Sequence, residues 1–184
     1  GIPCYGIEPT ASTAAVAKQK GIHIIGEFFG ESLAKELVNQ GKSADLIAAN
    51  NVLAHVPDIN DFVKGFATLL KSNGVATFEF PHLLNMVRLN QFDTAYHEHF
   101  SYLSLTAVKT IFESQGLHIF DVEELVTHGG SLRVYAQTGS HHAVSFQVEN
   151  ILQPNQAAGI RNMAFYVQLQ ANAEKVKNDV LAYL

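Results

Sequence analysis

Acid–base side chains are concentrated in one stretch of the chain, residues 90–104. The stretch holds two histidines, His97 and His99, together with the carboxylates Asp93 and Glu98, two tyrosines and several amides and hydroxyls. Its apolar residues follow neither the period of a helix nor that of a strand, so packing against a core does not account for its composition. An imidazole beside a carboxylate can serve as a general base. The stretch therefore predicts a site for proton transfer.

Two other interpretations of this stretch are open. It can be a polar loop in which Ser104 caps a helix that begins at Leu105. Alternatively, His97, Glu98 and His99 can be ligands in a metal-dependent hydrolase, although their spacing differs from the helical His-Glu-x-x-His pattern of such enzymes. The sequence thus favours proton transfer without a metal.

Composition restricts the class of protein. The formal net charge of -5 and the lack of a run of lysines and arginines argue against non-specific nucleic-acid binding. The single cysteine, Cys4, excludes an intrachain disulfide and a zinc site made of cysteines alone within this chain. No apolar run reaches about 18 residues, and we find no signal peptide, so we expect a cytoplasmic protein that does not enter a membrane.

Strands and helices alternate through the first 81 residues. The pattern predicts strands at 4–8, 22–25, 44–49 and 75–80, separated by helices at 10–20, 32–40 and 59–70. Asn73-Gly74 is predicted to be the turn before the fourth strand. Such alternation is typical of an open α/β sheet whose strands run parallel.

A hairpin is predicted to close the sheet. A helix at 105–115 precedes two strands, at 117–125 and 132–137, which a turn at 127–130 joins. This ending is typical of the class I methyltransferase sheet, whose last strand lies antiparallel, whereas a nicotinamide-binding Rossmann domain continues with strand–helix units. The predicted fold class is therefore α/β, with the Rossmann-like sheet of the class I methyltransferases that use S-adenosylmethionine (SAM).

The C-terminal part is predicted to be a polar connector, residues 140–155, followed by a long helix from Ala157. One apolar stripe on that helix needs a surface to bury it: Ile160, Ala164, Val167, Ala171, Val176, Val180 and Leu184. The stripe can cover the sheet, lead into a further domain, or mediate self-association.

Ligands of an open α/β sheet bind beyond the carboxyl ends of its strands, and four such ends carry suitable groups. Glu8 closes the first strand and can accept hydrogen bonds from both hydroxyls of a ribose. Phe28 and Phe29 can flank a purine or be ordinary core aromatics. The other two ends carry Asn50, Asn51 and His55, and Glu79-Phe80-Pro81. No Gly-x-Gly-x-x-Gly element precedes Glu8, so we expect the first strand of the fold and its glycine-rich loop to lie before residue 1.

Four segments of the chain carry a family resemblance. They are Tyr-Gly-Ile-Glu-Pro at 5–9, Ala-Asp-Leu-Ile-Ala-Ala-Asn-Asn-Val-Leu-Ala-His-Val-Pro-Asp at 44–58, Asn-Gln-Phe-Asp with Tyr-His-Glu-His-Phe-Ser-Tyr at 90–102, and Thr-His-Gly-Gly-Ser-Leu-Arg-Val at 127–134. Together they resemble the SAM-dependent C-methyltransferases that act on nucleotide-linked keto-deoxysugars. The resemblance runs over nearly all of residues 1–137. It implies a methyltransferase domain at 1–139, truncated at its N-terminus, and the start of a C-terminal domain at 140–184.

The resemblance also implies roles for single residues. Glu8 would hold the cofactor ribose, Phe28 and Phe29 would line the adenine, and Asn50 and Asn51 would lie near the methionine end. His99 would be the general base with Glu98 as its partner or rival, while His55, Tyr96 and Tyr102 would orient the sugar. SAM would be the cofactor; zinc belongs to an N-terminal domain of the family whose cysteines have no counterpart here.

The reaction that this assignment implies is methylation of a carbon next to a ketone. A base removes a proton from that carbon, and the resulting enolate takes the methyl group from the sulfonium. Two alternatives stand beside it: the metal-dependent hydrolase that uses His97, Glu98 and His99, and a non-catalytic fragment that dimerises through its C-terminal helix.

Overall fold

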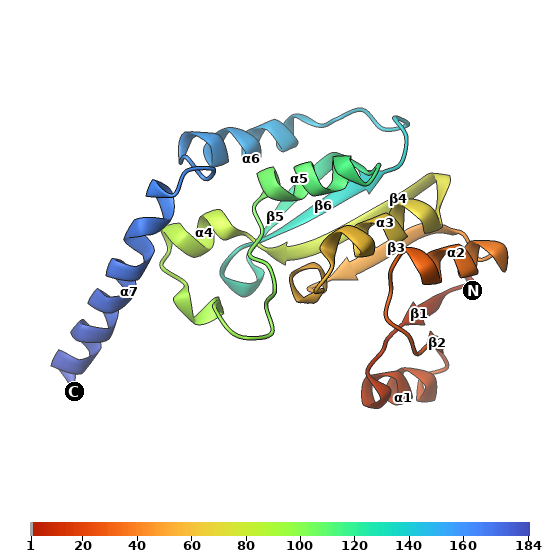
Figure 1. The fold of residues 1–184 in the computed structure, drawn as a ribbon, viewed down its shortest axis with the longest axis horizontal. Coiled ribbons are helices and arrows are strands. Elements are labelled where there is room, and N and C mark those ends of the chain that lie inside the picture. The colour runs from red at the N-terminus through yellow and green to blue at the C-terminus, as the bar shows by residue number, and fades with distance from the viewer. Residues whose placement is uncertain (1) are drawn as a thin grey trace.

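The first two strands form a small parallel sheet of their own. In the computed structural model, which describes residues 2–184, β1 (Tyr5–Ile7), α1 (Ala11–Gln19) and β2 (His23–Ile25) make one strand–helix–strand unit. Tyr5 pairs with His23 and Ile7 with Ile25, in parallel register. This unit lies apart from the main sheet (Figure 1).

The main sheet has four strands in the order β3-β4-β6-β5. Strands β3 (Ala44–Asn50) and β4 (Leu70–Pro81) are parallel and are joined by η1 (Leu53–His55) and α3 (Ile59–Leu69). The segment after β4 contains α4 (Leu83–Arg88), η2 (Phe92–Thr94) and α5 (Leu105–Ser114). Strands β5 (His118–Leu125) and β6 (Ser131–Gln137) then form an antiparallel hairpin around η3 (Thr127–Gly129), and β6 pairs antiparallel with β4. The predicted closing hairpin is confirmed.

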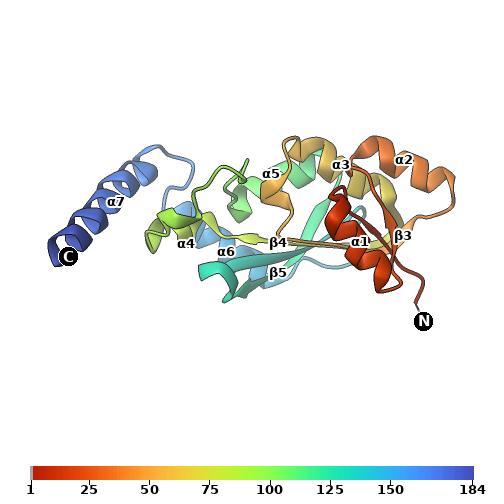
Figure 2. The same cartoon turned by 90° about the horizontal axis from the view of Figure 1, so that it is seen from below.

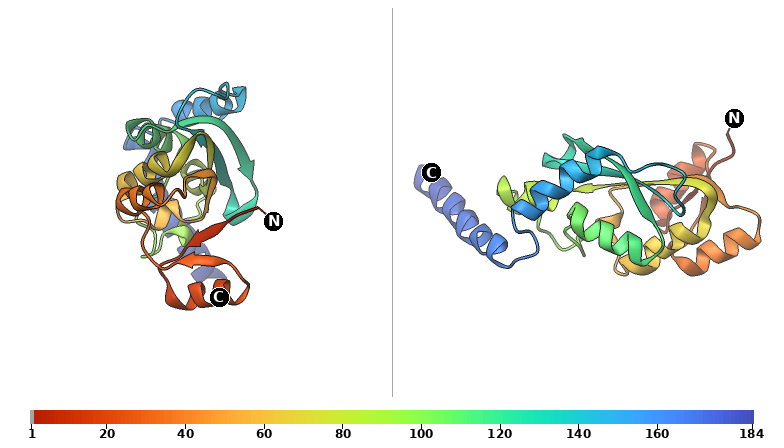
Figure 3. Two further views of the ribbon diagram at one scale, coloured as in Figure 1. Left: turned by 90° about the vertical axis from the view of Figure 1, so that its right-hand side faces the viewer. Right: turned by 90° about the horizontal axis from the view of Figure 1, so that it is seen from above.

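The separation of the two sheets differs from the single open sheet that we expected. Within residues 2–184, no strand pairing links β1 or β2 to β3. Instead, side chains connect them: Tyr5 and Ile7 pack against α2 (Glu31–Asn39), and the Tyr5 hydroxyl donates to the Lys42 carbonyl at 2.8 Å. A view along the sheet shows β1, β2 and α1 set off from the larger strands (Figure 3, left).

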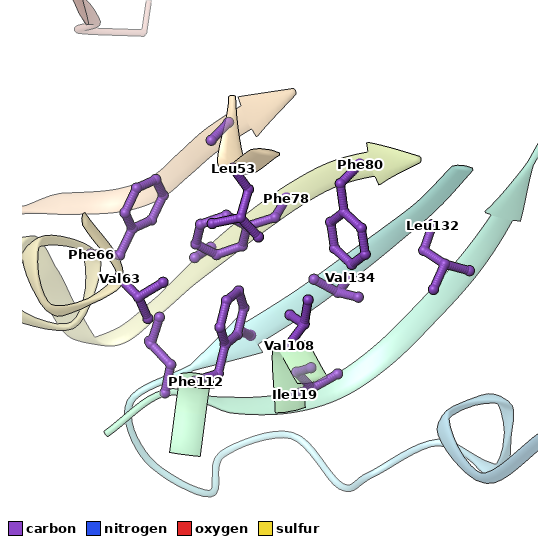
Figure 4. Close-up of a cluster of buried hydrophobic side chains, with 14 of the residues drawn as sticks. Leu53, Val63, Phe66, Phe78, Phe80, Val108, Phe112, Ile119, Leu132 and Val134 are labelled. Atoms are coloured by element: carbon purple, nitrogen blue, oxygen red, sulfur yellow. The ribbon is translucent and has the colours of Figure 1, made fainter. Parts of the chain in front are cut away.

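The core lies between the main sheet and the helices that cover one of its faces. Helices α2, α3 and α5 form a row over this face (Figure 2). Phe78 of β4 lies between Phe66 of α3 and Phe112 of α5, with ring centroids 4.4 and 4.7 Å away (Figure 4). The alternation of a strand explains why Phe78 and Phe80 face this core while the intervening Glu79 faces the opposite side.

Strand β4 begins at Leu70, five residues earlier than predicted, and Asn73-Gly74 lies inside it. The interpretation of Asn73-Gly74 as a turn was wrong. The pairing of β3 with β4 shifts register between Ala44 and Leu46, and a Cβ on Gly74 would lie 2.9 Å from the Ala44 carbonyl oxygen. The glycine therefore permits a close backbone approach at an irregular part of the ladder.

The C-terminal segment holds two helices where a polar connector and one helix were predicted. Helix α6 (Phe146–Ala157) begins in the predicted connector, and α7 (Ala164–Tyr183) begins seven residues after Ala157, because Gly159 at φ 73° interrupts the helix. Val148 of α6 is buried in the main core, although the predicted division at residue 140 places it in the C-terminal part.

The apolar stripe of the last helix is not covered in this structure. Ile160 is buried, but it precedes α7, and no residue of this helix is buried. Val167 is 71% exposed, and α7 extends away from the rest of the molecule (Figure 1). Among the helices of residues 2–184, none combines the length and apolar character that crossing a bilayer requires.

A buried pair of polar side chains attaches α6 to the end of β4. His82 directly follows β4 and is 2% exposed; its Nε2 lies 3.4 Å from Nδ2 of Asn155, which is also fully buried. Asn155 Nδ2 donates to the Ile151 carbonyl at 2.6 Å. Burial lowers the pKa of His82 to about 4, the Asn155 contact opposes this shift, and the charge of Arg88 adds to it. His82 is therefore a neutral imidazole at pH 7.

We expect Gly65→Ala to destabilise the protein although alanine favours helices by ~1 kcal/mol over glycine. Gly65 lies in α3, and a Cβ there would come within 2.9 Å of the Gly30 carbonyl and the Phe29 ring. Relieving this overlap should cost about 1–3 kcal/mol in the free energy of unfolding, measured by urea titration. Gly26→Ala is the control, because no atom lies within 4 Å of its Cβ position. Equal or greater stability of Gly65→Ala would contradict the close approach of α3 to Gly30.

We also expect His82 to make the stability depend on pH. Unfolded His82 has an ordinary pKa near 6.5, against about 4 when folded, so the unfolded chain binds the proton more tightly. The stabilisation is fully present above pH 6.5 and is lost as the pH falls toward 4. The free energy of unfolding should fall by about 2 kcal/mol between pH 7 and pH 5 from this group alone.

A pair of variants tests the assignment of this pH dependence to His82. Urea unfolding at both pH values should show a flatter profile for the double variant His82→Leu/Asn155→Leu, which removes both buried polar groups. The exposed His118→Gln serves as the matched histidine control and should keep the wild-type profile. An unchanged profile in the double variant would show that another group causes the loss.

Candidate active site

The carboxyl end of β3 positions two of the predicted site residues. Asn50 ends the strand, and Asn51 adopts a left-handed conformation at φ 55° while its backbone N–H donates to the Glu79 carbonyl of β4 at 2.8 Å. The next residues form η1, in which Leu53 and Ala54 are buried. The bond between Asn51 and Glu79 and the burial of Leu53 and Ala54 fix His55 beside the end of β3.

The segment 96–102 is held against η1 by backbone hydrogen bonds. The Ala54 carbonyl accepts from the N–H groups of Phe100, at 2.9 Å, and Ser101, at 3.2 Å. In addition, Nδ1 of His55 donates to the Glu98 carbonyl at 3.0 Å. The acid–base stretch therefore lies beside the carboxyl end of β3, in the region where ligands of such sheets bind.

His99 is the centre of a cluster of rings. Its ring centroid lies 4.2 Å from that of Tyr96, 4.6 Å from that of His55 and 5.7 Å from that of Tyr102. The Tyr102 hydroxyl donates weakly to the Tyr96 carbonyl at 3.5 Å. The structure thus brings together four of the five residues predicted to be catalytic, and the backbone of the fifth, Glu98, contacts His55.

The hydrogen bonds of both histidines determine their tautomers. His99 Nδ1 lies 3.0 Å from the Thr94 carbonyl oxygen, which can only accept a hydrogen bond. In the neutral imidazole the proton is therefore on Nδ1, and Nε2 carries the free lone pair. The same argument applies to His55 and the Glu98 carbonyl. Both rings thus retain Nε2 as a proton acceptor.

A small, largely apolar pocket adjoins His99. It is formed by the end of β4, the start of α4 and the acid–base stretch, and its lining includes Ala54, Pro81, Leu83, Thr94, His99 and Tyr102. Apolar walls limit the access of water to a reacting group. His99 is half-buried at this pocket, whereas the side chains of His97 and Glu98 are exposed.

The ligands proposed for a metal-dependent hydrolase do not converge. Within residues 2–184, no three His, Cys, Asp or Glu side chains gather closely enough to hold a metal ion. His97, Glu98 and His99 follow one another along the chain but do not make such a cluster. The alternative of a metal site built from these three side chains has no support in the geometry.

The predicted cofactor residues lie on both sheets. Glu8 follows β1, and its Oε1 accepts from the Thr10 N–H at 2.7 Å. Phe28 is 84% exposed, while Phe29 packs edge-on against Phe62 and Phe66, at 5.7 and 5.3 Å between centroids. Asn50 is exposed at the end of β3. Among the described residues, no hydrogen bond links Glu8 or Phe28 to the cluster around His99.

Sequence reasoning missed an ion pair beneath this edge of the sheet, in which the Glu79 carboxylate is buried and Arg133 is partly exposed. Glu79 is 5% exposed; its Oε2 accepts from Arg133 at 2.9 Å and its Oε1 from the Thr127 hydroxyl at 3.2 Å. Tyr135 donates to Glu123 at 2.9 Å, and burial, together with this hydrogen bond, raises the pKa of its phenol. The sequence does contain a signal for this ion pair: the charged Glu79 stands between Phe78 and Phe80 at the apolar end of β4.

The Thr94 and Ala54 carbonyls were also missed, for a different reason. Both are backbone groups, so the residue type carries no information about their partners. Only the path of the chain places them next to His99 and the 100–101 amides.

Comparisons with known proteins place the chain among methyltransferases. Residues 1–122 match the family described as "Methyltransferase domain", and residues 126–184 match the family described as "C-methyltransferase C-terminal domain". C-methyltransferase NovU of Streptomyces niveus is 34% identical over 176 residues, which are 95% of this chain and 42% of that protein. The chain therefore spans about two fifths of the length of this curated relative.

Solved structures share the fold at low sequence identity. Magnesium protoporphyrin IX methyltransferase of Synechocystis, solved with bound SAH, has a TM-score of 0.56 and 15% identity, over 76% of this chain and 65% of its own. A SAM-dependent methyltransferase of Thermotoga maritima, described as a possible histamine N-methyltransferase, has a TM-score of 0.56 and 13% identity. The match covers 73% of this chain and 72% of the Thermotoga chain. The fold of this chain is that of the class I SAM-dependent methyltransferases.

Proposed function

This chain belongs to the methyltransferase family, and from that premise we propose that it is the catalytic part of a SAM-dependent C-methyltransferase acting on a nucleotide-linked keto-deoxysugar. The observation that carries the proposal is the half-buried His99, whose Nδ1–H is bound to the Thr94 carbonyl so that Nε2 is the basic nitrogen. The acceptor class rests on the Tyr-His-Glu-His and Thr-His-Gly-Gly-Ser-Leu-Arg segments, which resemble the sugar C-methyltransferases.

The side chains at the strand ends suit the proposed cofactor. The Glu8 carboxylate can accept from ribose hydroxyls, and the exposed ring of Phe28 offers a face to adenine. Phe29, anchored on Phe62 and Phe66, fixes the backbone from which Phe28 extends. The amides of Asn50 and Asn51 would face the methionine end. When bound, SAM supplies an electrophilic methyl group.

His99 would abstract the proton from the carbon next to the sugar ketone. An imidazole titrates near neutral pH, which suits a general base, and the Thr94 carbonyl holds this ring in the tautomer that accepts at Nε2. Glu98 precedes His99 in the chain and its side chain is exposed; its carboxylate would approach the imidazolium that forms or compete with His99 as the base. The enolate would then attack the methyl group, and no metal is needed for that step.

The neighbouring side chains would orient the sugar and its developing charge. The Tyr96 hydroxyl is a donor that can stabilise an enolate oxygen, and the Tyr102 hydroxyl can do the same in exchange for its weak bond to the Tyr96 carbonyl. His55 donates its Nδ1 proton to the Glu98 carbonyl, so its Nε2 is an acceptor, which suits a sugar hydroxyl rather than an oxyanion. We therefore expect the tyrosines to act as donors and His55 to act as an acceptor toward the sugar.

The double variant His99→Gln/Glu98→Gln tests the assignment of the base. In the whole protein, turnover should fall by about 10²–10⁴-fold, the usual contribution of general base catalysis, while cofactor affinity measured by titration stays within about 3-fold. His97→Gln is the matched control, because His97 is the exposed neighbour in the same stretch, and it should keep its turnover. Full turnover in the double variant would reject His99 and Glu98 as the base.

Self-association through α7 is a separate proposal. The helix exposes Val167, Val176 and Val180, and Leu184 directly after it is also exposed; burying such a stripe against a second copy would stabilise the helix. Light scattering should give a molecular mass that rises with concentration for this chain. The double variant Val176→Asp/Val180→Asp should keep the mass of a monomer at all concentrations. A monomeric mass of the unaltered chain at high concentration would count against the proposal.

A further inference from the structure

Two sequence segments with no role in the proposed reaction contact each other beside the site. They are Asn90-Gln91, which precedes η2, and the loop 127–130, which contains η3. The Gln91 Nε2 donates to the Gly129 carbonyl at 2.8 Å, across 38 positions of sequence. This contact joins the acid–base stretch to the β5–β6 hairpin.

The loop 127–130 has a backbone built for this contact. His128, Gly129 and Gly130 all have positive φ, at 52°, 75° and 117°. A Cβ on Gly129 would lie 2.3 Å from Gln91 Nε2, and one on Gly130 would lie 2.5 Å from Asn85 Nδ2. The positive φ favours glycine at both positions, and a side chain at either would displace the amide of Gln91 or Asn85.

The loop is also tied to the sheet on its other side. The Thr127 hydroxyl donates to the buried Glu79 carboxylate, and the Thr127 carbonyl accepts from the Gly130 N–H at 2.9 Å and from the Ser131 hydroxyl at 3.1 Å. The Gly130 carbonyl accepts from the His82 N–H at 3.0 Å. Gln91 therefore bonds to a fixed acceptor rather than to a free loop.

From Gln91 a short path of hydrogen bonds leads to His99. The Gln91 N–H donates to the Met86 carbonyl at 2.9 Å, closing α4, and the Gln91 carbonyl accepts from the Thr94 N–H at 3.2 Å. The Thr94 carbonyl in turn accepts from His99 Nδ1 at 3.0 Å. This path connects Gln91 to the carbonyl that binds Nδ1 of His99.

We propose that Gln91 is a positioning residue, which by its bond to the Gly129 carbonyl holds the Thr94 carbonyl against Nδ1 of His99. This inference rests on the proposed function only for its effect on turnover; the effect on the His99 tautomer follows from the hydrogen bonds alone. Without the Gln91 donor, η2 is no longer tied to the Gly129 carbonyl, and the Thr94 carbonyl moves away from Nδ1 of His99. The His99 imidazole then exchanges between its two neutral tautomers.

Gln91→Met tests this role, because it keeps the length of the side chain and removes the donor. In the 184-residue chain labelled with ¹⁵N-histidine, the His99 ring signals should shift toward the tautomer with the proton on Nε2, or broaden by exchange. In the whole protein, kcat should fall by about 10–100-fold, while KM and the cofactor affinity change by less than about 3-fold. Gln168→Met, on the exposed surface of α7, is the matched control and should leave both readouts unchanged.

A second variant keeps the test decisive if Gln91→Met folds poorly. Thr127→Val removes the tie between the loop and Glu79 but leaves Gln91 in place, so it should move the same His99 signals in the same direction by a smaller amount. Thermal unfolding of each variant reports whether the fold is intact. His99 signals and kcat equal to the wild type in folded Gln91→Met would overturn the proposal.

The two readouts separate this inference from the proposed reaction. If the whole protein shows no methyl transfer but the ring signals of His99 move in Gln91→Met, the positioning role stands and the proposed function fails. If wild-type turnover is present and neither variant changes the signals, the positioning role fails while the function stands.

Discussion

The parallel pairing of β3 with β4 is the constraint from which the site follows. It places the carboxyl ends of both strands at one edge of the sheet, and the bond from the Asn51 N–H to the Glu79 carbonyl extends the ladder one residue beyond β3. The chain leaves β3 into η1 and leaves β4 into the segment that carries His99. Because the Ala54 carbonyl then binds the 100–101 amides, two segments more than 40 positions apart become one surface.

Buried polar groups hold that edge in place from behind. Glu79, between two core phenylalanines, is compensated by Arg133 and Thr127, whose contacts also fix the loop after β5. His82 and Asn155 connect the same edge to α6. A buried charge or amide is costly unless it is paired, so each of these pairs restricts the arrangement of the elements that contribute it. The side chains proposed to react are thus supported from behind by Glu79, Arg133, His82 and Asn155.

Much of this arrangement was predictable because local rules determine it. Gly21, Gly41 and Gly116 directly follow the helices predicted at 10–20, 32–40 and 105–115 and all have positive φ, which ends a helix. The alternation of strands and helices gave the element order. The acid–base stretch could be found because its composition has no packing explanation, and His55 because it follows a strand end. The closing hairpin was likewise predictable from two strands flanking a glycine-rich turn.

What could not be predicted depends on contacts distant in sequence or on the backbone. Asn73-Gly74 has the composition of a turn, but pairing with β3 keeps it in β4. Helix α6 was missed because it contains Pro154 and a buried Asn155, whose partner His82 lies 73 positions away. The split between the two sheets and the carbonyl partners of both histidines leave no trace in residue types.

The closeness of the two imidazoles determines how a ligand meets this edge of the sheet. His55 and His99 lie with ring centroids 4.6 Å apart, and each already donates its Nδ1 proton to a carbonyl. Each ring therefore leaves only its Nε2 for a ligand, and the backbone carbonyls fix the orientation of both rings. A single small ligand can therefore contact both rings at once.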